Sequence, residues 1–149
     1  MSASGTLFLV EDSDRTIFSA CSSRSDWYSA LGVIEKRGEL QSTFIGDSVD
    51  AWRELLERHP GLLHRLFFGE FSSVDDSNGS GDPHMFFAGS CVVSAAAAEL
   101  SQPTDVLLRD SFDLDANSVH PGLRESIPVI REFLLLASGK SRAVVGLWG

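Results

Sequence analysis

The segment AVVGLW, from Ala143 to Trp148, consists only of apolar residues and one glycine. A strand with one face in water alternates apolar and polar residues, whereas a strand covered on both faces is apolar along its whole length. The segment therefore predicts a strand, close to the end of the printed sequence, that is buried on both faces.

A helical pattern precedes this strand. In the segment IPVIREFLLLA, apolar residues recur with helical spacing on one face: Ile127, Ile130, Phe133, Leu134 and Ala137. Gly139 predicts the end of this helix. We expect Pro128 in the first helical turn, where the missing backbone N–H costs little.

Other elements are expected earlier in the chain. The segment TLFLV, Thr6 to Val10, predicts a strand because it is rich in β-branched and aromatic residues. Asp12 or Ser13 is expected to cap a helix that follows it, and Asp26 to cap a second one. Ser90 is expected to cap an alanine-rich helix that follows the predicted strand HMFFAG.

Helices and strands are thus expected in an irregular order, without a repeating strand–helix–strand unit. This pattern favours an α+β fold with a small mixed sheet and several helices packed on it. A chain of 149 residues fits one compact domain, residues 1–149. We find no signal peptide and no apolar run near the ~20 residues that span a bilayer. We therefore expect a cytoplasmic protein with no membrane partner.

The net charge of −9 is concentrated in two acidic tracts. The first, residues 70–84, has no Lys or Arg and contains Glu70, Asp75, Asp76 and Asp82. The second, residues 99–115, has one arginine, Arg109, and contains Glu99, Asp105, Asp110, Asp113 and Asp115. Such a field repels phosphate backbones, which excludes nucleic acid, and it attracts a basic protein partner.

Motifs for phosphate binding, calcium binding and a serine nucleophile are incomplete or absent in the sequence. SGKS at 138–141 resembles the end of a phosphate-binding loop, but the required glycine is Leu134 and the order is helix into strand. The loop VDDSNGSGD lacks calcium ligands at the first and twelfth positions, which hold Val74 and Met85. No GxSxG segment occurs. Cys21 and Cys91 are expected to be free core thiols, and we expect neither a metal nor a cofactor.

The histidines have no metal-binding spacing, since neither HxH nor HxxxH occurs. His64 lies in LLHRLFFGE, where we expect a short helix and a structural role for the imidazole. An alternative is a ligand pocket of aromatic and imidazole side chains: Trp52, His64, His120 and Trp148.

Several of these segments resemble the YfbM-like family of bacterial proteins. Asp50, Ala51 and Trp52 followed by LHRLFFGE are similar to the D-x-x-W … L-H-x-L-x-x-G segment of that family. SVHPG is similar to its Tyr-Pro turn, with His120 in place of tyrosine. The helix VIREFLLLASG and the segment RAVVGLWG resemble the family's ending.

The resemblance covers most of the chain in order and implies one compact α+β domain. The chain departs from the family at the longer stretch with ERHPG after Trp52 and in the loop SSVDDSNGSGDP. The resemblance implies no particular activity, because none is established for the family. Proteins that resemble it are associated with bacterial toxin–immunity neighbourhoods.

Three hypotheses follow. The first is a non-enzymatic acidic protein-binding module, an immunity-type inhibitor of a more basic toxin or enzyme, that binds through Asp75, Asp76, Asp82, Asp110, Asp113 and Asp115. The second is a small cytoplasmic enzyme or ligand-binding protein that uses the aromatic and histidine pocket. The third is an interaction module unrelated to toxins.

Overall fold

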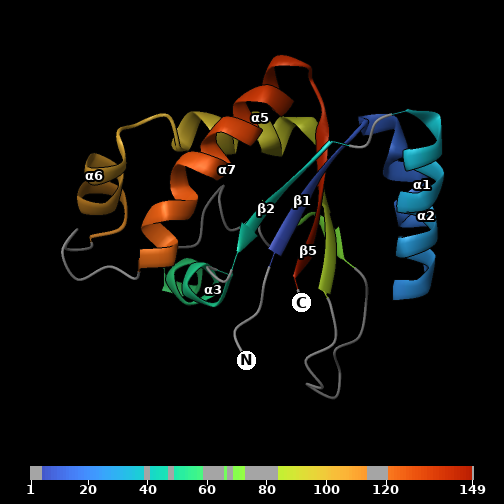
Figure 1. The fold of residues 1–149 in the computed structure, drawn as a ribbon, viewed down its shortest axis with the longest axis horizontal. Coiled ribbons are helices and arrows are strands. Elements are labelled where there is room, and N and C mark those ends of the chain that lie inside the picture. The colour runs from blue at the N-terminus through green and yellow to red at the C-terminus, as the bar shows by residue number, and fades with distance from the viewer. Residues whose placement is uncertain are drawn as a thin grey trace.

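The computed structural model contains a five-stranded sheet with helices on both faces (Figure 1). It describes residues 5–38, 41–46, 49–58, 66, 69–72, 84–113 and 121–148. In sheet order, the strands are β2 (Ser42–Gly46), β1 (Gly5–Val10), β5 (Ala143–Trp148), β4 (His84–Ala88) and β3 (Phe71–Ser72).

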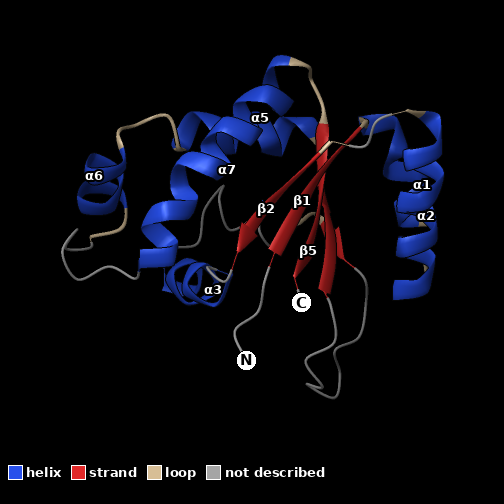
Figure 2. Cartoon of the chain, in the orientation of Figure 1, coloured by secondary structure: helices blue, strands red, loops and turns tan. Residues whose placement is uncertain are grey.

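The helices form the two outer layers (Figure 2). One layer contains α1 (Arg15–Ser19) and α2 (Arg24–Arg37), with a 3-10 turn over Asp12–Asp14 before α1. The main helices of the opposite layer are α3 (Val49–Arg58), α5 (Ser90–Glu99) and α7 (Pro121–Gly139). The short α6 (Thr104–Val106) continues into a π turn over Leu107–Ser111.

Each face of the sheet has its own hydrophobic cluster. On the side of α1 and α2, the buried side chains include Phe18, Trp27, Ile34, Met85, Phe87 and Val145. On the side of α3, α5 and α7, they include Leu7, Trp52, Phe86, Val93, Ile130, Leu134 and Val144. Among the described residues, strands β1, β4 and β5 contribute side chains to both clusters, so the sheet carries both cores.

The central strand β5 has the burial that its sequence predicts. Ala143, Val144 and Val145 are all fully buried. Because side chains alternate along a strand, Val144 enters the α5 and α7 cluster and Val145 enters the α1 and α2 cluster. The prediction of a strand buried on both faces is confirmed.

The α+β class is also confirmed, but the strand directions differ from our expectation of a mixed sheet. All four described pairings are antiparallel: β1–β2, β1–β5, β4–β5 and β3–β4. The first and last described strands lie side by side, with Gly5 opposite Trp148 and Val10 opposite Ala143. No single segment encodes the direction of so distant a pairing.

Helix α7 is longer than the sequence predicts. It begins at Pro121, so Pro128 lies inside the helix and not in its first turn. The upstream residues Leu123 and Ile127 are 3% and 0% exposed, and their burial stabilises the additional helical turns. Pro128 itself is exposed, so its ring projects away from the core.

The start of α2 also differs from the prediction. The N-cap is Ser23, whose side-chain oxygen accepts the backbone N–H of Asp26 at 3.2 Å. Asp26 stands in the first turn, where its carboxylate accepts the backbone N–H of Ser22 at 2.9 Å. Hydrogen bonds from the backbone and hydroxyl of Ser22 hold the pKa of Asp26 below its usual value.

Two glycine substitutions test the packing of the sheet against its surroundings. Gly146→Ala is expected to destabilise the protein by roughly 2–3 kcal/mol, because the added carbon overlaps the buried ring of Phe86. Gly32→Ala, in α2, is the control: nothing lies within 4 Å of the added carbon, and we expect a gain of about 0.5–1 kcal/mol. Urea unfolding measures both. An unchanged midpoint for Gly146→Ala contradicts the close approach.

Candidate functional site: the charged end of the sheet

Several strands bring their termini together at one end of the sheet. Val10 at the end of β1 lies opposite Ala143 at the start of β5, and Ala88 at the end of β4 lies opposite Val144. The backbone N–H of Glu70, just before β3, donates to the Phe87 carbonyl at 2.8 Å. We call the charged residues gathered there the charged end: Glu11, Asp12, Asp14, Arg15, Arg37, Glu70 and Arg142.

Asp14 is the buried member of the charged end. Its side chain is 2% exposed, and its two oxygens have different partners. Oδ1 accepts from the Arg37 guanidinium at 2.7 Å, and Oδ2 accepts from the Glu11 backbone N–H at 3.0 Å. Since a buried carboxylate is costly without partners, these bonds are needed to keep Asp14 in place.

Two other carboxylates cap a helix to which they do not belong. The N-cap of α5 is Gly89, not Ser90 as the sequence predicts. The Gly89 N–H donates to Glu70 Oε2 at 2.7 Å, and the Ser90 N–H donates to Asp12 Oδ1 at 2.8 Å. The Ser90 hydroxyl also donates to Asp12. Carboxylates at this terminus compensate the free N–H groups and the positive end of the helix dipole.

The same bonds explain why the prediction that Asp12 or Ser13 caps α1 is wrong; the N-cap is Asp14. Asp12 is directed toward α5, and the 3-10 turn before α1 is capped reciprocally by Glu11 and Asp14. Arg15, at the start of α1, links this helix to Glu70, which caps α5. Its guanidinium lies 2.9 Å from Glu70 and 5.2 Å from the centre of the Phe87 ring.

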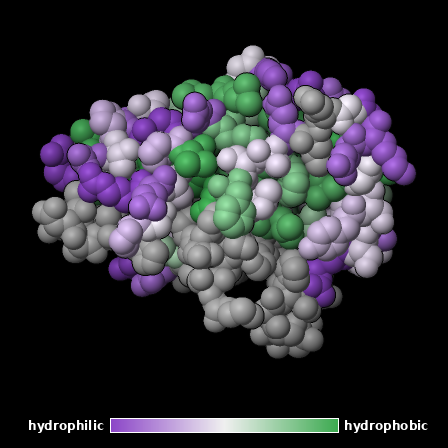
Figure 3. Space-filling model, in the orientation of Figure 1, coloured by the Kyte–Doolittle hydropathy of each residue, from purple (hydrophilic) through white to green (hydrophobic). Residues whose placement is uncertain are grey.

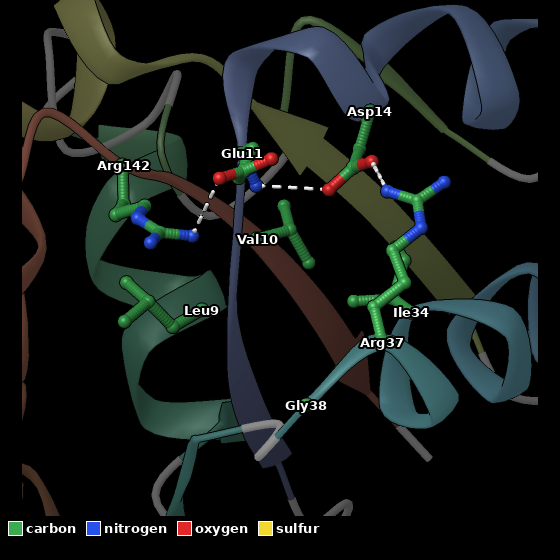
Figure 4. A pocket seen from close by; sticks show the side chains of 8 residues that line it. All are labelled: Leu9, Val10, Glu11, Asp14, Ile34, Arg37, Gly38 and Arg142. Atoms are coloured by element: carbon green, nitrogen blue, oxygen red, sulfur yellow. Dashed lines mark hydrogen bonds and ion pairs between the residues drawn. The ribbon is translucent and has the colours of Figure 1, made fainter.

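A cavity of about 250 Å³ opens beside Asp14 (Figure 4). Its apolar wall includes Leu9, Val10 and Ile34, and its charged lining consists of Glu11, Asp14, Arg37 and Arg142. Arg142 lies 3.2 Å from Glu11, and in Figure 4 the two arginines stand on opposite sides of the carboxylates. Formal charges in the lining cancel, while each guanidinium keeps several N–H donors for a ligand.

Of the predicted partner-binding aspartates, the structure describes two. Asp110 is 56% exposed and lies 2.8 Å from Arg109. The hydrogen bond from Arg109 lowers the pKa of Asp110, so this carboxylate is charged at neutral pH. Asp113 is exposed and has a backbone φ of 52°, in the left-handed region that aspartate tolerates.

Other predicted site residues lie outside the described residues. These are Asp75, Asp76 and Asp82 in the first tract, Asp115 in the second, and the histidines His64 and His120. Their roles stay predictions.

The two tryptophans of the alternative pocket belong to different elements. Trp52 in α3 is 0% exposed, and its indole N–H donates to the hydroxyl of Ser126 in α7 at 2.8 Å. Ser126 in turn donates to the Leu123 carbonyl. Trp148 is the last residue of β5. Trp52 therefore joins α3 to α7 within the core, and it does not line the cavity beside Asp14.

The two cysteines differ in their exposure. Cys21 is half-buried, and its thiol donates to the Ile17 carbonyl at 3.3 Å. Burial, with a smaller effect from Asp26, raises the pKa of Cys21, which reduces the thiolate fraction at neutral pH. Cys91 is exposed, so the expectation that both thiols lie in the core is wrong for this residue.

Two further features concern the described part of the chain. No group of three or more His, Cys, Asp and Glu side chains there is arranged to hold a metal ion. None of the described helices is long and apolar enough to cross a membrane.

The sequence interpretation missed the charged end as a site. EDSD at 11–14 was assigned only a helix-capping role, and Arg37 and Arg142 were not considered. The available signal was a dense charged segment placed directly after a predicted strand. Its partners could not be identified, because Asp12 and Ser90 are 78 residues apart and Asp14 and Arg37 are 23 apart.

These features define a single-domain α+β protein with a five-stranded antiparallel sheet between two helical layers. Among solved structures, the chain is similar to YfbM from Escherichia coli, a protein of unknown function. The TM-score is 0.60 and the match covers 98% of this chain and 99% of YfbM, with 12% sequence identity. The chain therefore has a YfbM-like fold. No family model and no curated protein matches it.

The stability of the charged end can be tested at its buried carboxylate. Arg37→Met is expected to destabilise the protein by about 1–3 kcal/mol, because it removes the cation that Asp14 faces while keeping the aliphatic stem. This range allows for the half-exposed position of Arg37. Arg58→Met is the matched control: Arg58 and Glu54 form an exposed pair on α3, and we expect a change below about 0.5 kcal/mol. Equal effects in urea unfolding would show that Asp14 does not depend on Arg37.

Proposed function

We propose that this chain is a non-enzymatic acidic protein-binding module, an immunity-type inhibitor that blocks a more basic toxin or enzyme in the cytoplasm. The observation that carries the proposal is the net charge of −9, with 21 carboxylates against 12 Lys and Arg. A surplus of this size attracts a cationic partner before contact and raises the association rate, most strongly at low salt. Membership of the YfbM-like family is part of the proposal, supported by the shared motifs and by the match over nearly the whole of both chains.

Ion pairs formed by aspartates of the second tract bear on which carboxylates contribute to the field. Arg109 lies 2.8 Å from Asp110, and Arg124 lies 2.7 Å from Asp105. Both aspartates stay more than half exposed, so a partner can replace either arginine at a small cost. Asp113 forms no ion pair within the described part of the chain. We therefore expect Asp113 to contribute most among the described members of this tract.

A kinetic experiment tests the proposal once a partner enzyme has been captured from the native host and shown to lose activity on mixing. Asp113→Asn is expected to slow association about two- to threefold at low salt, because a charge is lost from the steering field. Asparagine tolerates the left-handed backbone, so the variant keeps its fold. The triple change of Asp75, Asp76 and Asp82 to Asn is expected to slow association about tenfold. Surface plasmon resonance at two salt concentrations gives the rates.

The matched control is Glu35→Gln, an exposed carboxylate of α2 outside both tracts, which should leave the rate near that of the wild type. Association that is equally fast in all variants, or a captured partner that is itself acidic, contradicts the proposal.

A second candidate function, the binding of a small ligand, is supported by the cavity beside Asp14. Its guanidinium groups and the apolar wall of Val10 and Ile34 fit a short-chain carboxylic acid, with the carboxylate at an arginine and the hydrocarbon on the wall. This cavity differs from the predicted pocket at Trp52, which is buried in the core between α3 and α7 and does not line the cavity.

Thermal unfolding with millimolar butyrate tests this candidate. Butyrate is expected to raise Tm by about 2 °C or more, because a ligand that binds only the folded state stabilises it. The shift should disappear in Arg142→Gln and persist in Arg58→Gln, whose arginine lies on α3 and does not line the cavity. Butylamine should have no effect. Equal shifts with both compounds, or none with either, would exclude this ligand class.

A further inference from the structure

Large exposed apolar side chains flank β2, which forms one edge of the sheet among the described strands. β2 has one neighbouring strand, β1, among the described strands, and α7 packs beside it. Phe44 in β2 is 64% exposed, and α7 exposes Val129 and Leu136 at 39% and 41%. We call these three residues the β2-edge patch. In Figure 3, apolar surface gathers over β2 and the neighbouring part of α7, between more hydrophilic surfaces on either side.

Phe44 lies on the face of the sheet that α2 partly covers. Thr43 is opposite Leu7, which belongs to the cluster under α7, and Phe44 is opposite Thr6. Because neighbouring residues of a strand point to opposite faces, Phe44 points away from α7. Ile45 confirms the alternation, since it is 5% exposed and belongs to the α7 cluster.

Val129 and Leu136 flank the same edge from the other face. They are seven residues apart, which places them two turns apart on one side of α7. The opposite side of α7 faces α5 and its downstream segment. Arg131 donates to the backbone carbonyls of Leu100 and Gln102. The Ser138 hydroxyl donates to the Ser94 hydroxyl. The exposed apolar stripe therefore lies on the side of α7 that borders β2.

The charges around the patch indicate the kind of partner that fits it. Glu125 and Glu132 stand one turn before and after Val129, and both are exposed. Neither forms an ion pair within the described part of the chain. Residues 41–46 carry no charge, and the cation Lys140 lies one turn beyond Leu136. The carboxylates thus gather at the Val129 end, where they complement lysine or arginine.

We propose that the β2 edge is the docking surface for the basic partner, which adds an extended segment beside β2; this inference rests on the proposed function. Pairing with the β2 backbone sets the register of the added strand. Because its side chains alternate, those on one face cover Phe44, and those on the other lie over α7 near Val129 and Glu132. A segment of alternating apolar and cationic residues satisfies both faces.

A synthetic peptide of alternating valine and lysine with a fluorescent end group is the probe. Its binding to the full chain is measured by fluorescence anisotropy at low salt. Phe44→Ser and Val129→Ser are each expected to weaken binding about tenfold, because each removes an apolar contact at the centre of the interface. Changing Glu125 and Glu132 to Gln should weaken binding and flatten its salt dependence. A version of the peptide with alternate amides N-methylated cannot pair its backbone, and it should bind about tenfold more weakly.

The matched control is Leu135→Ser, a 52% exposed apolar residue on another side of α7, which should leave affinity within about twofold. Binding that survives both Phe44→Ser and N-methylation overturns docking at β2 while leaving the acidic module intact. If neither this peptide nor oligolysine binds at low salt, both proposals fail. A dimer in sedimentation that Phe44→Ser dissociates would assign the edge to a second copy of the chain, which also overturns the inference.

Discussion

Burial of β5 on both faces determines how the rest of the chain is arranged. Val144 and Val145 point to opposite sides of the sheet, and both are fully buried, so each side needs its own covering helices. Burial contributes about 0.8 kcal/mol for each CH₂ group, so exposing either valine costs more free energy than a surface contact contributes. The close approach of Phe86 to Gly146 follows from the same arrangement, because a ring can lie flat on β5 only where the strand has no side chain.

A sheet covered on both faces leaves its strand ends and its outer strands as the places where polar groups can collect. The charged end lies where β1 and β4 end. There, Asp12 and Glu70 accept hydrogen bonds from the N-terminal N–H groups of α5. Asp14 links the 3-10 turn after β1 to α2 through its bond with Arg37. Most of these charges are therefore already used in holding helices to the sheet. A ligand in the adjacent cavity would have to bind the remaining guanidinium donors of Arg37 and Arg142 without displacing their carboxylates.

The sequence predicts elements that carry their own pattern, and it fails where the pattern belongs to two distant segments. Thr6–Val10 and Ala143–Trp148 were predicted as strands because the composition of each is sufficient. The helix around Ile130 and Phe133 was predicted from its spacing. Pro128 was placed in its first turn, but the helix begins at Pro121, since the burial of Leu123 depends on neighbours elsewhere in the fold. Helix caps were assigned to the nearest Ser or Asp, whereas α5 takes its carboxylate from Asp12. The cavity beside Asp14 has no local signature at all, because its lining comes from three separate parts of the chain.

Acidic tracts and the β2 edge would act at different stages of an encounter. Screening limits the field of exposed carboxylates to about 10 Å at 0.1 M salt, so the tracts can guide a cationic partner but cannot hold it in one orientation. Arginines beside Asp105 and Asp110 weaken that field further. Holding a partner requires short-range contacts, and the β2 edge offers them through the large exposed ring of Phe44, the stripe of Val129 and Leu136, and a strand backbone at the end of the sheet. Substitutions in the tracts should therefore change mainly the association rate, and substitutions at the edge mainly the dissociation rate, because only the latter contacts break when the partner leaves.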